Sequence, residues 1–471
     1  MAPKPLVFVP GFPGTKLLDK VSGDELFPNL LGLITPGLRN QLLARLRGPD
    51  DPDQDDGVVA GPPIDKALPL LPFVDLSGIF KQAGSLYDVL RKLGYKITDA
   101  SFGDRFRPVG WDWRRPVDQQ DALASLKAAI VELGAATGEK VTLLCHSTGG
   151  LVARSLLDKD PTVAPLLDRL IALAVPWAGT LQPLPLLAGS SGWGPLTAAQ
   201  TQGALGRSWA AFDLLPPDPA KTDMTGVDLF RDAAGQPSSP LVATGWVPAG
   251  ADGQAMKDRA QRSDAALGAR SRTLDLGGVE VVNVVGWRED TLARASVDAQ
   301  GRLAFQDDPE GDGTVPRPSA AWIRGPRVHT YLVPIGRYPN DLIRRLHIVL
   351  WENQPVRDLL AAHLAGRPLP PYVYAAADAD DAVDVERPKI RVYIVALDPL
   401  GNPLAGAFAT AAGSSTQFGV GADGAGMMLL DRGLAQNAGH GFFRFQVRFQ
   451  DANGAPLGKP QALTIQGPAV L

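Results

Sequence analysis

Short apolar runs alternate with longer amphipathic segments along most of the chain. The apolar runs are of strand length and lie at residues 6–9, 141–145, 170–175, 279–285 and 328–333. Segments with helical spacing occur near residues 87–94, 118–133 and 150–158. Short apolar strands that alternate with helices are typical of a mostly parallel sheet that is covered on both faces. The pattern therefore predicts an α/β domain for residues 1–374.

The pattern changes after residue 374. Residues 375–387 are small and acidic and predict a linker, whereas 389–397 and 441–449 alternate between apolar and polar positions. Alternation with a period of two indicates half-buried strands, so we expect an all-β sandwich at 388–471. Because every candidate catalytic residue precedes this module, we expect a protein that ends near residue 383 to keep its activity on small esters.

Two long stretches of the first domain do not show the alternation of strands and helices. Residues 19–86 and 181–278 are too long for ordinary connections, and they predict insertions that form a cap or lid. Apolar residues of the second insertion, including Trp193, Trp209, Phe212 and Leu214, are expected to line the lid and to favour an acyl chain as ligand.

Composition limits the classes of function. Of 471 residues, 45% are hydrophobic and 20% charged, and 46 Lys and Arg face 50 Asp and Glu, which gives a net charge of −4. No basic run suggests a nucleic-acid partner. The single cysteine cannot form an internal disulfide, and no apolar run approaches the ~20 residues that span a bilayer. By default we expect a soluble cytoplasmic protein, with export by another route left open; nothing indicates its oligomeric state.

Residues 145–150 read Cys-His-Ser-Thr-Gly-Gly and lie between a predicted strand and a predicted helix. This is the layout of a nucleophile elbow, Gly-x-Ser-x-Gly, with Cys145 in the place of the first glycine. A serine at the tip of the turn is exposed to substrate, whereas a cysteine within the strand is buried. We therefore predict Ser147 as the nucleophile, and we expect His146 to face elsewhere.

A serine nucleophile needs a base, and the base needs an orienting acid. In this layout the chain order is Ser, Asp or Glu, then His, on loops after late strands. Asp312 lies between two glycines after strand 279–285, and His347 follows strand 328–333. We prefer these two residues to Asp308 and Glu310, which fit an acidic surface turn, and to His329, which begins a strand.

The chemistry also needs N–H donors for the oxyanion. The residue after the nucleophile, Thr148, supplies one backbone N–H, and a loop after an early strand supplies the other. Phe12 in Val9-Pro-Gly-Phe-Pro-Gly-Thr15 fits the second position, with a simple structural turn as the alternative. No metal or cofactor is required for such a reaction.

With these pieces assembled, the chain resembles the lecithin:cholesterol acyltransferase family, which includes lysosomal phospholipase A2. The matching motifs lie at residues 9–15, 109–115, 145–150, 174–180, 311–316 and around His347. The resemblance implies an α/β-hydrolase fold, the triad Ser147, Asp312 and His347, and an oxyanion hole formed by Phe12 and Thr148.

Three further residues in these motifs receive roles from the resemblance. Trp111 and Trp177 are expected on the wall of the substrate pocket. Asp112 is expected to hold a loop by pairing with an arginine.

The expected function is that of a serine carboxylic-ester hydrolase, like a lipase, phospholipase or esterase, that acts through an acyl-enzyme. Its substrate is expected to be a lipid acyl ester, met in transient contact with a lipid surface. Two alternatives stay open. One is a lipid acyltransferase, which passes the acyl group to an alcohol in place of water. The other is a non-catalytic protein that binds a lipid or a surface.

Overall fold

The computed structural model describes most of the chain. The described residues are 2–29, 32–33, 35–65, 82–98, 101–192, 196–308, 310–335, 347–367, 372–377, 381–382, 384–398, 402–439 and 442–466.

A six-stranded sheet forms the centre of the first domain. Its strands are β1 (Leu6–Val9), β5 (Phe106–Pro108), β6 (Val141–His146), β7 (Leu167–Leu173), β9 (Glu280–Trp287) and β12 (Val328–Pro334). Their order is β12-β9-β7-β6-β1-β5, and each neighbouring pair is parallel. Successive side chains of β1 alternate between two buried clusters, with Val7 and Val9 in one and Leu6 and Phe8 in the other. The sheet is therefore buried on both faces, as its continuous apolar strands predict.

Helices cover both faces of this sheet. They are α4 (Gln82–Lys92), α5 (Gln120–Thr137), α6 (Thr148–Lys159) and α12 (Gln354–Ala365). Apolar residues of α5 and α6 join the cluster of Val7 and Val9, whereas those of α4 and α12 join the cluster of Leu6 and Phe8. Because β6 lies between β1 and β7, the turn from β6 into α6 stands near the middle of the sheet.

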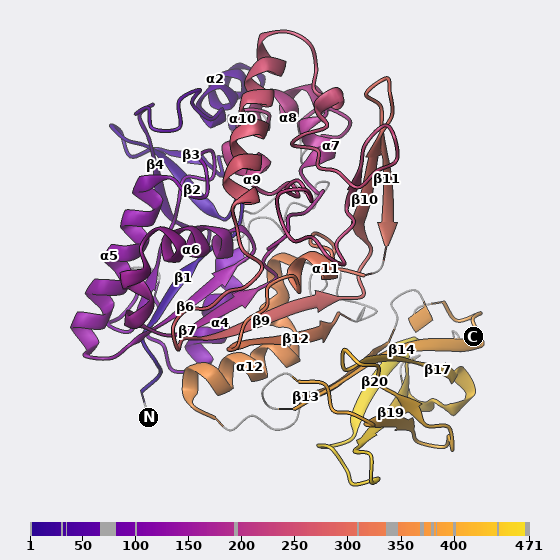
Figure 1. Ribbon diagram of the computed structural model, residues 1–471. Coiled ribbons are helices and arrows are strands. Elements are labelled where there is room, and N and C mark those ends of the chain that lie inside the picture. The colour runs from indigo at the N-terminus through magenta and orange to yellow at the C-terminus, as the bar shows by residue number, and fades with distance from the viewer. Residues whose placement is uncertain are drawn as a thin grey trace.

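The two insertions form smaller elements beside the sheet. The first contains β2 (Thr15–Asp19), β3 (Glu25–Phe27), β4 (Val58–Pro63) and α2 (Pro36–Leu46), and the three strands form one sheet. The second contains α7 (Leu184–Leu187), α8 (Ala198–Leu205), α9 (Trp209–Asp213), β8 (Phe230–Arg231) and α10 (Ala251–Gly268). Helices α2, α7, α8 and α10 gather at the top of Figure 1. None of the helices in the described ranges is long and apolar enough to cross a membrane.

A hairpin that the sequence pattern did not predict lies between β9 and Asp312. Its strands, β10 (Thr291–Val297) and β11 (Leu303–Asp308), are antiparallel, and β10 also pairs with β8. Asp308, expected in a surface turn, is the last residue of β11 and pairs with Thr291. The short helix α11 (Arg317–Ala320) follows Asp312.

The C-terminal strands form two sheets with a shared apolar cluster. One sheet contains β13 (Tyr372–Ala377), β14 (Lys389–Leu397) and β17 (Ala425–Asp431). The other contains β15 (Phe408–Ala411), β16 (Phe418–Gly419), β18 (Gln436–Gly439), β19 (Phe442–Gln450) and β20 (Gln461–Gln466). Buried residues of both sheets, including Ile394 and Phe445, belong to one cluster. These strands form a body at the lower right of Figure 1.

The linker expected at 375–387 begins inside a strand. Residues 372–377 form β13, which pairs antiparallel with β14 along its whole length. The small side chains that suggested a linker are thus part of the C-terminal sheet, because alanines also fit a strand that is covered by a neighbouring layer.

Together these observations confirm the predicted fold class. The first domain has the architecture of the α/β-hydrolase fold, with a mostly parallel sheet, helices on both faces and inserted cap elements. A β-sandwich follows it at the C-terminal end.

Candidate active site

The turn from β6 into α6 places Ser147 in a strained conformation. Its φ is 51° and its ψ is −130°, a region that costs a non-glycine residue about 1–3 kcal/mol. The turn is also tightly packed, because a Cβ atom at Gly149 would lie 2.4 Å from the Val9 carbonyl oxygen. The second glycine of the elbow motif is therefore required by space, and the strained serine stands at the tip of the turn as the motif predicts.

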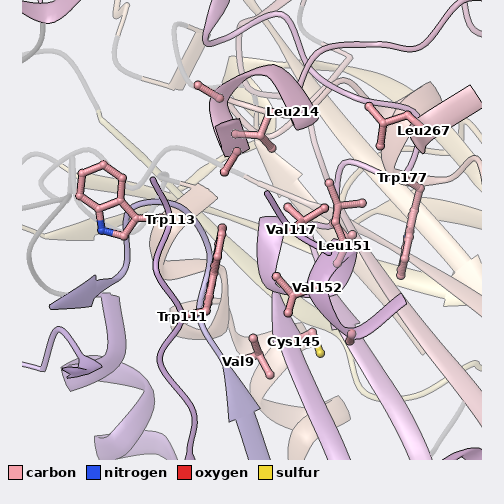
Figure 2. Packing of buried hydrophobic residues seen from close by; sticks show 14 of the residues in the cluster. Val9, Trp111, Trp113, Val117, Cys145, Leu151, Val152, Trp177, Leu214 and Leu267 are labelled. Atoms are coloured by element: carbon pink, nitrogen blue, oxygen red, sulfur yellow. The ribbon is translucent and has the colours of Figure 1, made fainter. Parts of the chain in front are cut away.

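Cys145 lies away from this tip. It is completely buried in the cluster on the α5 and α6 side of the sheet, and Figure 2 shows it among the packed residues of that cluster, with its sulfur below Val152. Burial raises the pKa of its thiol well above the ordinary range. A buried thiol that stays protonated is a poor nucleophile, which favours Ser147 as the reactive residue.

Asp312 and His347 are in direct contact. The Oδ2 atom of Asp312 lies 2.7 Å from Nδ1 of His347, and both side chains are buried. The other carboxylate oxygen, Oδ1, accepts the backbone N–H groups of Thr314 (3.1 Å) and Val315 (2.7 Å). The carboxylate is thus fixed by three donors. Gly313, with φ 86°, provides the tight turn that brings these N–H groups back to the side chain.

This contact determines which nitrogen of His347 carries the proton. A carboxylate only accepts hydrogen bonds, so Nδ1 must donate and Nε2 of the neutral ring carries the lone pair. The Nε2 atom is buried and has no hydrogen-bond partner among the described residues, Ser147 included. The ring is therefore arranged as a base whose free nitrogen still has to meet a proton donor, and such contacts often close only when substrate binds.

His146 contacts His347, so the expectation that it faces elsewhere is wrong. Its Nε2 lies 3.0 Å from the backbone oxygen of His347, the two ring centroids are 4.9 Å apart, and Trp351 packs edge-on at 5.0 Å. Burial, with a smaller contribution from His347, lowers the pKa of His146 well below 6.5. The neutral His146 ring thus donates to the His347 carbonyl and holds the start of the segment that carries the base.

The two expected oxyanion donors lie next to each other. The N–H of Phe12 points to Oγ1 of Thr148 at 3.4 Å, and Thr148 is the first residue of α6. At this distance the hydrogen bond is weak, so the Phe12 N–H group remains available for a stronger acceptor such as an oxyanion. The amino-terminal end of a helix also favours negative charge. The Phe12 ring packs edge-on against Trp113, with a centroid distance of 5.3 Å.

Trp111 and Trp177 are buried in the protein. The Trp111 indole N–H donates to the Pro10 carbonyl at 2.9 Å, and that of Trp177 donates to Asn283 Oδ1 at 3.0 Å. Both rings lie among the packed residues of Figure 2. Each nitrogen is already paired, so a substrate would meet only the faces of these rings. Their assignment to the pocket wall stays a prediction.

The remaining sequence expectations concern packing. Asp112 forms an ion pair with Arg114 at 2.7 Å, and Arg114 also reaches Asp56 of the first insertion at 2.6 Å, so this motif holds a loop as expected. In the second insertion, Trp209 is buried, donates to the Pro49 carbonyl at 2.9 Å and stacks under Arg259 at 4.5 Å. Its ring therefore packs within the cap. Trp193 lies outside the described residues.

The sheet order, the strained elbow and the buried Asp–His pair define the class of the protein as an α/β-hydrolase. Comparison with known proteins shows which proteins the chain is similar to. A family model described as lecithin:cholesterol acyltransferase matches residues 73–238. This confirms the resemblance that the motifs indicate. The matched stretch contains the elbow but neither Asp312 nor His347.

Curated relatives match over a short stretch. The phosphatidylcholine-sterol acyltransferase of Homo sapiens is 31% identical over 120 residues, which cover 24% of this chain and 26% of that protein. The protein of the same name from Rattus norvegicus is 32% identical over 120 residues, which cover 24% of this chain and 26% of that protein. The match thus spans about a quarter of the length of these relatives.

Solved structures are more distant. A chain of the Tle4–Tli4 complex is 14% identical with a TM-score of 0.45, over 77% of this chain and 98% of that one. The mature form of the Bacillus licheniformis lipase BlEst2 is 13% identical with a TM-score of 0.29, over 71% of this chain and 84% of that one.

Proposed function

We propose that the protein is a serine carboxylic-ester hydrolase that acts on lipid esters through Ser147, His347 and Asp312. The observation that carries the proposal is the buried hydrogen bond of 2.7 Å between Asp312 and His347 Nδ1, which leaves Nε2 as the free base. A surface ion pair would not need this burial. The pair is also linked to the elbow, because the His347 carbonyl accepts a hydrogen bond from His146, the residue before the strained Ser147.

The proposed reaction begins with proton transfer from Ser147 Oγ to His347 Nε2 as Oγ attacks the ester carbonyl carbon. The N–H groups of Phe12 and Thr148 stabilise the resulting oxyanion. His347 then returns the proton to the leaving alcohol, and an acyl-enzyme on Ser147 remains. Water, activated by the same imidazole, releases the acid. Throughout, Asp312 holds the ring in one orientation and stabilises the imidazolium.

The lipid nature of the substrate rests on the family resemblance. The matched relatives are phosphatidylcholine-sterol acyltransferases by name, which supports an acyl ester of a lipid as substrate. The same relatives favour a second candidate, in which an alcohol takes the acyl group in place of water. Both reactions share the acyl-enzyme and differ only in its final acceptor.

A panel of substrates separates these candidates. The purified protein is incubated with p-nitrophenyl esters of increasing chain length and with phospholipids, with and without an added sterol or simple alcohol. We expect release of free acid in every reaction that turns over. New esters in place of acid would favour the acyltransferase. A folded protein that binds lipid vesicles but turns over none of these substrates would contradict both and favour a binding protein.

A further inference from the structure

The loop that carries Asp312 is held at a narrow base. The chain leaves the central sheet at the end of β9, forms the β10–β11 hairpin and returns at Gly311. Backbone contacts close the base, with the Glu289 N–H donating to the Gly311 carbonyl at 2.9 Å and a bridge between Glu289 and Asp312. The position of the Asp312 carboxylate therefore depends on how firmly the two ends of this excursion are held.

One carboxylate ties these two ends together. Glu310 Oε2 accepts the Trp287 indole N–H at 2.9 Å and Arg317 Nε at 2.7 Å, and its Oε1 pairs with Arg288 Nη1 at 3.1 Å. The Arg317 backbone N–H also donates to the Glu310 carbonyl at 2.7 Å. We call Trp287, Arg288, Glu310 and Arg317 the acid-loop clamp. Glu310 is only two residues from Asp312, so movement of the clamp moves the acid.

The C-terminal sandwich forms one side of this clamp. The Arg288 guanidinium packs against two neighbouring rings, 4.2 Å from the Trp287 ring and 4.0 Å from the ring of Tyr393 on β14. Trp287 and Tyr393 are each only 2% exposed. Arg288 has φ 78°, a conformation that is unfavourable for a residue with a side chain and needs support from its surroundings. Asp423 of the sandwich also pairs with Arg317 at 2.8 Å.

The contact between the sandwich and the catalytic domain contains a buried apolar cluster. A single buried cluster contains Val284 and Val333 of the central sheet together with Val395 and Leu397 of β14. Tyr331 of β12 packs against Tyr372 of β13, with ring centroids 5.4 Å apart. Such a joint is a continuous core, unlike the modest polar interface that usually connects separable domains.

We propose that the sandwich is part of the active-site scaffold, with Tyr393 as a positioning residue that acts on Asp312 through the acid-loop clamp. This inference rests on the proposed catalytic role of Asp312. It goes against the expectation that the sandwich is dispensable for action on small esters.

The two links between sandwich and clamp differ in strength. The side chains of Arg317 and Asp423 are 28% and 52% exposed, and ion pairs in contact with water contribute little. The Tyr393 ring, by contrast, covers a half-buried cation, where a cation–π contact is stronger. Tyr393 is therefore expected to carry most of the coupling and Asp423 only a small part.

The test uses the full-length protein and four variants. Tyr393→Leu removes the ring, Tyr393→Phe keeps its face, Asp423→Asn breaks the exposed ion pair, and Leu429→Ala changes an exposed residue of β17 as a matched control. Three quantities are measured for each: kcat and KM on a short soluble ester, the melting temperature, and the downfield proton NMR signal of the hydrogen bond between His347 Nδ1 and Asp312.

A displaced acid predicts a specific combination of results. Tyr393→Leu should lower kcat by roughly 10- to 100-fold, the range expected when a catalytic group shifts by about 1 Å, with KM little changed. Its downfield proton signal should broaden or move. Tyr393→Phe and Leu429→Ala should resemble the wild type in all three measurements, and Asp423→Asn should lie close to it.

Several results would overturn the inference. A folded Tyr393→Leu protein with wild-type kcat and an unchanged proton signal would show that the clamp does not need the ring. An equal loss in Tyr393→Phe would assign the effect to something other than the ring face. If Tyr393→Leu does not fold, Tyr393→Met, which also removes the ring face but fills the site with a flexible side chain, must show the same loss of kcat. A wild-type protein without any ester hydrolysis would contradict the proposed function, and the proton signal alone would then decide the positioning role.

Discussion

Replacement of Asp312 by asparagine is the substitution whose effect the geometry defines best. Oδ1 accepts two backbone N–H groups, from Thr314 and Val315, and Oδ2 accepts Nδ1–H of His347. An asparagine has only one oxygen, and the two backbone donors require it. Its NH2 group must then face His347, which forces Nδ1 to accept and places the ring proton on Nε2. His347 Nε2, the nitrogen that has to accept the proton of Ser147, would then already carry a proton.

The expected loss in kcat is about 10⁴-fold, the size of the effect when a serine protease is given the same wrong tautomer, and it corresponds to about 5.5 kcal/mol of activation free energy. Stability should change little, because the backbone donors keep their acceptor. Asp312→Ala is the matched comparison: it leaves two buried N–H groups without a partner, at about 1–3 kcal/mol each, so it should also lower the melting temperature. Turnover of a p-nitrophenyl ester and thermal melts check both variants. A folded Asp312→Asn protein within about tenfold of wild-type kcat would refute the tautomer argument.

Three further predictions concern Cys145 and His146 at the elbow and His363 on α12. Cys145→Ala should keep most of the esterase activity, because the thiol is buried and protonated; a loss as complete as that of Ser147→Ala would contradict the assignment of the nucleophile. His146→Leu should lower kcat by roughly tenfold or more with KM little changed, because the His347 carbonyl loses its donor at 3.0 Å, and His146→Gln, which can still donate, should recover part of that loss. His363 should make the fold acid-sensitive. Burial, aided by Arg169, lowers its pKa from 6.5 to about 4, so the unfolded chain binds a proton at a pH where the folded protein does not, and stability is lost as the pH falls from 6.5 towards 4. The loss of unfolding free energy attributable to His363 is roughly 2 kcal/mol at pH 5. Denaturant unfolding at pH 7 and pH 5 should therefore show a smaller decrease in the unfolding free energy of His363→Gln than of the wild type. An equal decrease in both proteins would rule out His363 as the source of the acid sensitivity.

The sequence was most informative where chemistry imposes a local pattern. The strand–turn–helix of the elbow needs small residues at fixed positions, and the acid and base of this fold follow the serine in a fixed order. The pairing of Asp312 with His347 could therefore be predicted from motifs separated by many residues. The central strands could also be predicted, because burial on both faces leaves runs of mostly apolar residues.

Other features depend on contacts that no local pattern records. Strand β11 is largely exposed and β10 is only partly buried, so neither strand has the apolar run that marked the central sheet. The orientation of His146 depends on where the His347 segment returns to the elbow. The alanines of β13 suggested a linker because small residues occur both in linkers and in strands that are covered by a neighbouring layer. The cation–π contact between Arg288 and Tyr393 joins two modules, and neither residue looks unusual in its own segment of the sequence.

Covalent labelling of the nucleophile tests the central claim most directly. The full-length protein and its Ser147→Ala variant are treated with a fluorophosphonate, which reacts only with a serine activated by a working base, and the modified peptide is identified by mass spectrometry. We predict stoichiometric modification of Ser147, none in Ser147→Ala, and slow labelling in Asp312→Asn. Modification of a different residue, or no reaction of a folded wild-type protein, would contradict the account of this site.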